Sequence, residues 1–151
     1  MSRTFAKILK AALLVGTLDI LAAFIYYYSK TGKNPLLILN YIASALLGKA
    51  AYTGGNGILL FGLLLHYAIA FTFTLFFFCL YPKLTFFRRS NILTSIIYGA
   101  FIWTVMNLII VPASRIPAQP FNATNALINM LILIVGIGLP LSFIAQQHYK
   151  L

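Results

Sequence analysis

The chain has 151 residues, of which 62% are hydrophobic and only 8% are charged. Soluble globular proteins carry about 25% charged residues, and a soluble domain with so few would expose large apolar patches and aggregate. The composition therefore excludes the soluble enzymes and predicts a single membrane domain covering residues 1–151.

The formal net charge of +10 arises from eleven basic residues and one acidic residue. A protein that binds nucleic acid gathers its basic residues on one face. Here they stand at the ends of apolar runs, which is the pattern of residues that flank a membrane and meet anionic lipid. We therefore expect membrane lipids as partners and no nucleic acid.

Four apolar runs are long enough to cross a bilayer, which takes about 20 residues. They are residues 11–28, 58–80, 92–111 and 123–145. The first run follows a basic segment, as the core of a signal peptide does, but Asp19 interrupts it and no cleavage site of small residues follows. It is therefore expected to remain in the protein as the first span.

The segment 35–52 is nearly as long as a span, yet it carries Lys49 and a polar stripe at four-residue spacing, Asn40, Ser44 and Gly48. The positive-inside rule decides whether it crosses, because cytoplasmic loops carry an excess of Lys and Arg. If it does not cross, the cytoplasmic side holds seven basic residues: Arg3, Lys7, Lys10, Lys83, Arg88, Arg89 and Lys150. The outer side then holds four: Lys30, Lys33, Lys49 and Arg115. If it does cross, the basic cluster between the second and third long runs moves outside and the rule is broken.

These patterns predict an all-α fold, an integral membrane four-helix bundle with an extra interfacial or re-entrant helix at residues 35–52. Both termini are expected on the cytoplasmic side. The polar stripe of the extra helix is expected to face water at the outer membrane surface.

Asp19 is the only acidic residue and lies near the middle of the first span. A charge at that depth costs about 2.5 to 3.5 kcal/mol on insertion scales, so an intramembrane carboxylate is a candidate for a functional site. Small residues flank Asp19 and His66 on their helix faces, which lets other helices approach closely. Counted from the outer ends of their spans, Asp19, His66, Asn107 and Asn129 reach similar depths. We expect these four side chains to form a hydrogen-bond network in the outer half of the bundle, with Asp19 as an acceptor.

Other features predict less specific roles. Lys49 and Arg115, expected on the outer side, are candidates for binding lipid headgroups. No metal site is expected, because one Asp and one buried His supply only two ligands, and no cofactor motif occurs. The aromatic residues of segment 71–78 are expected to face lipid or the interface, and Cys79 to be a small buried hydrophobe. Segment 136–140 should loosen or kink the fourth span.

Several short motifs occur together in the chain. They are Ile42-Ala43-Ser44-Ala45-Leu46-Leu47-Gly48-Lys49-Ala50-Ala51, Gly54-Gly55, Leu65-His66-Tyr67, Met106-Asn107, Val111-Pro112 and Gly138-Leu139-Pro140. In this combination the chain resembles a family of bacterial four-span membrane proteins with no assigned activity and, more distantly, the YagU-like inner-membrane proteins. The resemblance implies a multi-pass protein of the bacterial cytoplasmic (inner) membrane.

The favoured function is that of a small, non-enzymatic membrane protein whose polar pocket binds a small ligand, a lipid headgroup or a proton. An alternative is a structural or accessory subunit, in which polar residues fasten helices to one another, to a second copy or to a larger membrane complex. An enzyme that acts on a lipid or quinone is the third alternative, although no nucleophile and base stand at catalytic spacing. A binding pocket should be accessible, whereas polar residues that only fasten helices should be dry and fully hydrogen-bonded.

Overall fold

The computed structural model describes residues 3–149, and all regular structure within that range is helical. Four helical units are long and apolar enough to cross a membrane: Arg3–Thr31, Asn56–Leu80, Asn91–Ala113 and Ala123–Tyr149. The predicted all-α fold with four such helices is confirmed.

Two of the four units are uninterrupted helices, α1 (Arg3–Thr31) and α3 (Asn56–Leu80). The third unit consists of α4 (Asn91–Val105), the π-helical segment η3 (Met106–Ile110) and α5 (Val111–Ala113). The fourth consists of α6 (Ala123–Leu133), the π-helical segment η4 (Ile134–Gly138) and α7 (Leu139–Tyr149). The connections contain α2 (Leu37–Leu47) and two 3-10 helices, η1 (Gly48–Tyr52) and η2 (Thr85–Arg88).

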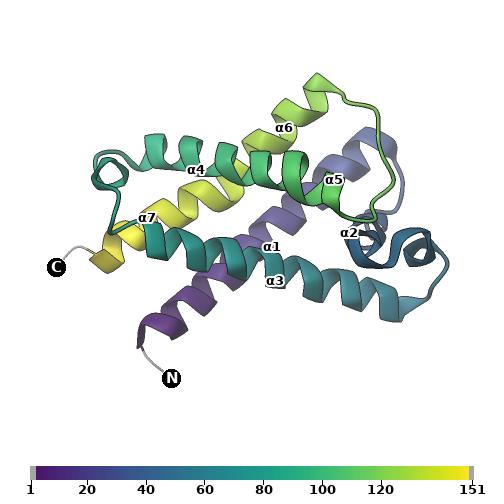
Figure 1. Cartoon of the computed structure of the whole chain (residues 1–151), viewed down its shortest axis with the longest axis horizontal. Coiled ribbons are helices and arrows are strands. Elements are labelled where there is room, and N and C mark those ends of the chain that lie inside the picture. The colour runs from purple at the N-terminus through teal and green to yellow at the C-terminus, as the bar shows by residue number, and fades with distance from the viewer. Residues whose placement is uncertain (1–2, 150–151) are drawn as a thin grey trace.

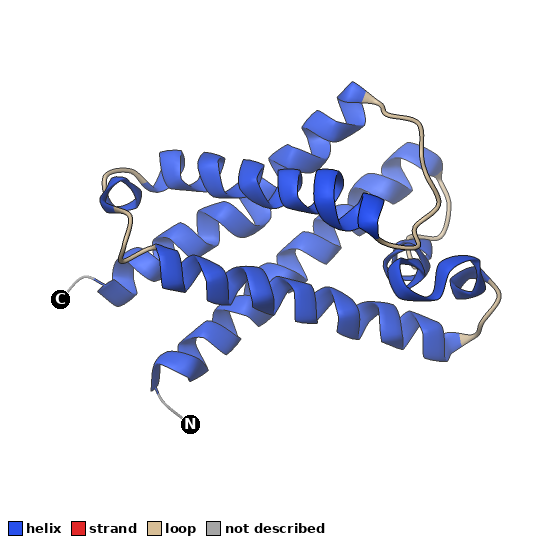
Figure 2. Ribbon diagram, in the orientation of Figure 1, coloured by secondary structure: helices blue, strands red, loops and turns tan. Residues whose placement is uncertain are grey.

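Consecutive long units run in alternating directions (Figures 1 and 2). α1 ends and α3 begins at the same end of the bundle, and α2 lies between them there, so we call this the α2 end (Figure 1). At the other, η2 end, Lys7 Nζ near the start of α1 lies 3.3 Å from His148 Nδ1 near the end of α7. Both ends of the described chain therefore lie on one side of the bundle. Lys150, which the sequence places among the cytoplasmic basic residues, lies outside the described residues.

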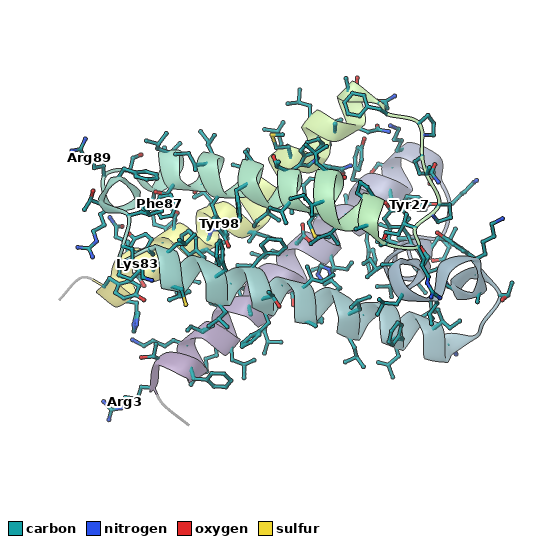
Figure 3. All side chains as sticks on the ribbon, in the orientation of Figure 1. Arg3, Tyr27, Lys83, Phe87, Arg89 and Tyr98 are labelled. Atoms are coloured by element: carbon teal, nitrogen blue, oxygen red, sulfur yellow. The ribbon has the colours of Figure 1, made fainter. Side chains whose placement is uncertain are left out.

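The core at the η2 end is aromatic. Phe77, Tyr81 and Tyr98 are each at most 1% exposed, and the rings of Phe77 and Tyr98 lie 4.6 Å apart. Phe87, which lies at this end together with Tyr98 (Figure 3), stacks on Phe77 at 5.9 Å. The Tyr98 hydroxyl donates a 2.5 Å hydrogen bond to the carbonyl oxygen of Phe73 and so fastens α4 to α3.

Two expectations about side-chain burial are corrected by this core. The aromatic residues of segment 71–78 were expected to face lipid, but Phe73, Phe77 and Phe78 are buried and only Phe76 is exposed among these four. Cys79 was expected to be buried and is exposed.

α2 packs on α3 through the polar stripe that was expected to face water. Asn40 and Ser44 are buried, and the Asn40 side-chain amide donates a 2.7 Å hydrogen bond to the carbonyl oxygen of Ala51. A Cβ added to Gly62 of α3 would overlap the carbonyl oxygen of Leu39, so the two backbones are in contact there. The prediction for Asn40 and Ser44 is wrong, because their polar groups satisfy the backbone of α2 and η1 and leave that face free to pack on α3.

Candidate functional site

A cavity of about 140 Å³ lies inside the bundle toward the α2 end. Its lining comes from α1, α2, α3, both π-helical segments and the neighbouring parts of the third and fourth units. Most of the lining side chains are apolar, and the exceptions are Asp19, Tyr41 and His66. The structure therefore brings together two of the four residues predicted to form a polar network.

Small residues bring α1 and α3 together beside this cavity. A Cβ added to Gly16 would lie 3.0 Å from the ring of Tyr67 and 3.2 Å from the Cβ of Ala70. Because Gly16 lacks a side chain, the Nε2 atom of His66 can reach its carbonyl oxygen at 2.8 Å. A carbonyl oxygen only accepts, so Nε2 carries a hydrogen, and Nδ1 is an acceptor in the neutral form of the imidazole.

Asp19 differs from His66 in its bonding. Its carboxylate interacts electrostatically with His66, but within residues 3–149 it forms no hydrogen bond or close ion pair. Every fully buried polar side-chain atom of the described residues has a hydrogen-bond partner, so the carboxylate oxygens are not sealed inside protein. Asp19 lines the cavity, and the carboxylate is therefore available to a molecule inside it.

Two π-helical segments border the cavity, through Met106 and Ile110 of η3 and Ile137 of η4. Each shows the five-residue hydrogen bond of a π-helix: Val111 N donates to Met106 O, and Leu139 N donates to Ile134 O. Such segments are rare in helices and occur frequently at functional sites.

Each π-helical segment lies next to a proline in the sequence. A proline in a helix lacks an N–H donor and clashes with the carbonyl four residues earlier. For Pro112 that carbonyl belongs to Leu108 in η3, and for Pro140 it belongs to Gly136 in η4. A wider helical turn accommodates both carbonyls, which explains why segment 136–140 is irregular, as predicted. The irregular turn at Pro112 is a feature that the sequence analysis missed, since it placed a helix end there.

The other two members of the predicted network lie elsewhere. Asn107 is exposed, and its amide donates a 3.0 Å hydrogen bond to the carbonyl oxygen of Trp103 in its own helical unit. Asn129 is exposed on α6, and neither residue lines the cavity. The expected four-residue network with Asp19 as an acceptor is not formed.

The two basic residues suggested for lipid headgroups, Lys49 and Arg115, are both exposed at the α2 end. The backbone N–H of Arg115 donates a 3.0 Å hydrogen bond to the carbonyl oxygen of Ala45, which fixes the 114–122 loop to α2. Arg115 also lines a surface groove together with Leu65 and Ile109.

Tyr41 is a site residue that the sequence analysis missed. It lines the cavity with Ile42 and Ala45 of the same helix, so α2 covers the cavity at its end. Burial, together with the neighbouring phenol of Tyr52, raises the pKa of Tyr41 above its ordinary value, so its hydroxyl stays protonated at neutral pH. Tyr41 and Ala45 are one helical turn apart, and this spacing could have indicated that they share a helix face. The polar stripe that begins at Asn40 lies directly beside this face and was interpreted instead.

No group of three or more His, Cys, Asp or Glu side chains within residues 3–149 is arranged to hold a metal ion. The polar chemistry of the cavity is therefore that of one carboxylate, one imidazole and one phenol. No family model, curated protein or solved structure matches the chain. The resemblance to the YagU-like proteins stays a prediction, and the function is inferred from the cavity itself.

Proposed function

We propose that this is a multi-pass protein of the bacterial cytoplasmic membrane that binds a small, mainly apolar molecule in the cavity beside Asp19 and His66. The bound molecule offers hydrogen-bond donors to the carboxylate and to Nδ1 of the imidazole. The single observation that carries the proposal is the position of Asp19, the sole acidic residue, on an apolar cavity with no hydrogen bond from the described chain.

The position of Asp19 within the long helix α1 is energetically costly. A carboxylate within a membrane-spanning helix costs about 2.5 to 3.5 kcal/mol, and interhelical hydrogen bonds commonly offset such a cost. Asp19 forms none with residues 3–149. A bound donor would supply the missing interaction, and the carboxylate is then retained for binding.

The size of the cavity restricts the ligand. A dry protein cavity of about 150 Å³ binds benzene, and the cavity here measures about 140 Å³. A single six-membered ring with one or two polar substituents therefore fits, whereas a phospholipid headgroup with its glycerol does not.

A structural role is the second candidate, and His66 favours it. The bond from His66 Nε2 to the Gly16 carbonyl oxygen already joins α3 to α1. In a purely structural subunit Asp19 would make a comparable interhelical bond. The absence of such a bond within the described residues is why we place the binding function first.

In this arrangement α2 lies at the outer membrane surface and both termini are cytoplasmic. The basic residues support it, because the η2 end carries six of those described and the α2 end four. Membrane lipids surround the four long helices, whose exposed side chains include many large apolar residues, among them Leu21, Leu64, Leu108 and Val135.

The proposal is tested with 4-fluorophenol and fluorobenzene as probes of the full-length protein in lipid nanodiscs, followed by fluorine NMR. We expect saturable binding of 4-fluorophenol that is about tenfold tighter than that of fluorobenzene, the effect of one good hydrogen bond to a charged group. Asp19→Leu should reduce this preference, because only His66 Nδ1 then remains to accept from the phenol hydroxyl. The matched control Asn129→Leu, which changes an exposed polar residue outside the cavity, should leave it unchanged.

Ala45→Phe, which places a ring in the cavity, should weaken the binding of both probes. If 4-fluorophenol does not bind in a saturable way, or if Asp19→Leu binds it with the same preference, the proposal is overturned.

A further inference from the structure

A second hollow adjoins the cavity on the outside of the bundle. It is a groove of about 420 Å³ on the surface formed by α3 and the third helical unit. Phe73, Phe76 and Phe101 contribute aromatic walls, and the rings of Phe76 and Phe101 stack at 5.7 Å. No charged residue lines the groove. The surface is therefore suited to a flexible hydrocarbon chain.

The groove and the cavity share part of their lining. Ile69 and Phe73 of α3 and Ile110 of η3 belong to both. One layer of three apolar side chains thus stands between Asp19 and the lipid-facing side of the bundle. Ile69 and Ile110 are only half-buried, so a change of their rotamers can open this wall without moving a helix backbone.

Polarity increases along this path. The groove has one polar residue, Thr72, whose hydroxyl donates to the carbonyl oxygen of Ala68 at 2.9 Å and is therefore engaged. The cavity behind the wall holds the Asp19 carboxylate and the His66 imidazole. A molecule that fills both spaces has an apolar tail and a polar head.

The chemistry of the two side chains restricts that head further. The carboxylate of Asp19 accepts hydrogen bonds when it is ionised, and Nδ1 of His66 accepts when the imidazole is neutral, because Nε2 donates to Gly16. Two hydrogen-bond acceptors in the cavity are complementary to a head group that carries two hydrogen-bond donors. Hydroquinone lipids have such a head, which is one ring in size and carries two hydroxyl groups, and they have a long apolar tail.

We infer that a tailed hydroquinone enters the cavity sideways from the bilayer between Ile69 and Ile110, its ring beside Asp19 and His66 and its tail in the α3 groove. This inference rests on the proposed binding function and names its ligand class and entry route. It concerns binding alone and includes no electron transfer.

The test is displacement of bound 4-fluorophenol from the full-length protein in nanodiscs, kept under anaerobic reducing conditions. The competitors are decylhydroquinone, which carries a tail, and methylhydroquinone, which does not. Competitor concentrations are expressed as mole fractions in the bilayer, so that partitioning is removed from the comparison. On this scale we expect the tailed competitor to displace the probe at about fivefold lower concentration, because packing along the groove adds to the contacts of the ring. Decylbenzoquinone, which has no donors and is assayed anaerobically without reductant so that it stays oxidised, should displace the probe less well than decylhydroquinone.

Two matched substitutions assign the route. Ala68→Trp fills the groove without touching the cavity, since Ala68 lines only the groove. It should abolish the greater potency of decylhydroquinone over methylhydroquinone, which we call the advantage of the tail, while leaving 4-fluorophenol bound. Ile109→Trp fills the neighbouring groove beside Arg115 and should leave the advantage intact. If Ala68→Trp does not fold, Phe76→Ala takes its place as the test. This variant removes one wall of the α3 groove without adding bulk and should reduce the greater potency of the tailed competitor.

The outcomes separate the two proposals. If 4-fluorophenol binds but the two hydroquinones are equally potent, the entry route and ligand class are wrong and the binding function stands. The entry route is likewise wrong if Ile109→Trp rather than Ala68→Trp removes the advantage, because the tail would then lie in the groove beside Arg115. If 4-fluorophenol itself does not bind, both proposals fall.

Discussion

His66 and Asp19 lie on the same cavity but differ in what they contribute to packing. The imidazole bonds to the carbonyl oxygen of Gly16 in another helix and is only 8% exposed. The carboxylate makes no such bond within residues 3–149 and remains partly exposed. Stability and ligand binding should therefore depend differently on the two residues.

Asp19→Asn is expected to leave the free energy of unfolding unchanged or slightly raised, since it removes a costly charge and no helix contact. His66→Ala is expected to lower it by about 1 to 3 kcal/mol, because an interhelical hydrogen bond is lost and a cavity is created. Thermal unfolding in detergent measures both, with Asn129→Ala as the exposed control. Marked destabilisation by Asp19→Asn would show that the carboxylate holds the fold together.

The meeting of Asp19 and His66 was predictable from the sequence, because small residues flank both and their distances from the span ends agree. The position of Asn107 outside the cavity was not predictable from the sequence. Asn107 lies in η3, where a π-helical turn replaces an α-helical one and changes the direction in which each following side chain points. Counting at 3.6 residues per turn fails across such a turn.

At the scale of elements, the two proline-linked π-helical segments shape the cavity wall. Pro112→Ala and Pro140→Ala restore an N–H donor and remove the clash with the preceding turn, so each segment can return to α-helix. We expect the thermal stability to be kept or raised and the binding of 4-fluorophenol to weaken, because Ile110 or Ile137 would turn away from its present position. Pro117→Ala, in the 114–122 loop, is the control. Unchanged binding in both variants would separate the π-helical turns from the site.

The attachment of α2 to α3 depends on Gly62. Gly62→Ala places a methyl group against the carbonyl oxygen of Leu39, and overpacking of this kind costs about 1 to 3 kcal/mol. We expect faster hydrogen exchange of the α2 amides, with little change in the central turns of α1. Gly57→Ala on the same helix meets no atom within 4 Å and serves as the control. Equal exchange in the two variants would mean that α2 is held by other contacts.

The burial of the aromatic residues shows why elements are easier to predict than their faces. Runs of apolar residues define all four long helices, but a lipid-facing and a core-facing Phe have the same hydrophobicity, because lipid is as apolar as the protein interior. Phe76 and Phe77 are neighbours in sequence, yet Phe76 is exposed whereas Phe77 is buried against Tyr98 of α4 and Phe87 of η2. The polar stripe of α2 was equally hard to predict, because Asn40 and Ser44 bond to backbone carbonyl oxygens of η1 and α2 and so become compatible with burial.

At the scale of the whole molecule, the two ends of the bundle differ in charge. Arg3, Lys83 and Arg89 lie at the η2 end, and Tyr27 lies toward the α2 end (Figure 3). Among the described residues the η2 end carries Arg3, Lys7, Lys10, Lys83, Arg88 and Arg89, and the α2 end carries Lys30, Lys33, Lys49 and Arg115. We propose from this difference that the η2 end lies in the cytoplasm.

This orientation is tested by labelling with a membrane-impermeant thiol reagent in a Cys79→Ser background, since the native cysteine is exposed. Thr53→Cys, at the α2 end, should react in intact cells, and Thr85→Cys, in η2, should react only in inverted vesicles. Reaction of both from the same side would mean that α3 does not cross. Replacing Lys83, Arg88 and Arg89 by Gln leaves three described basic residues at the η2 end, or four of the seven predicted cytoplasmic ones when Lys150 is included, against four at the α2 end. Thr53→Cys should then react from both sides, because the charge bias that sets the orientation has been removed.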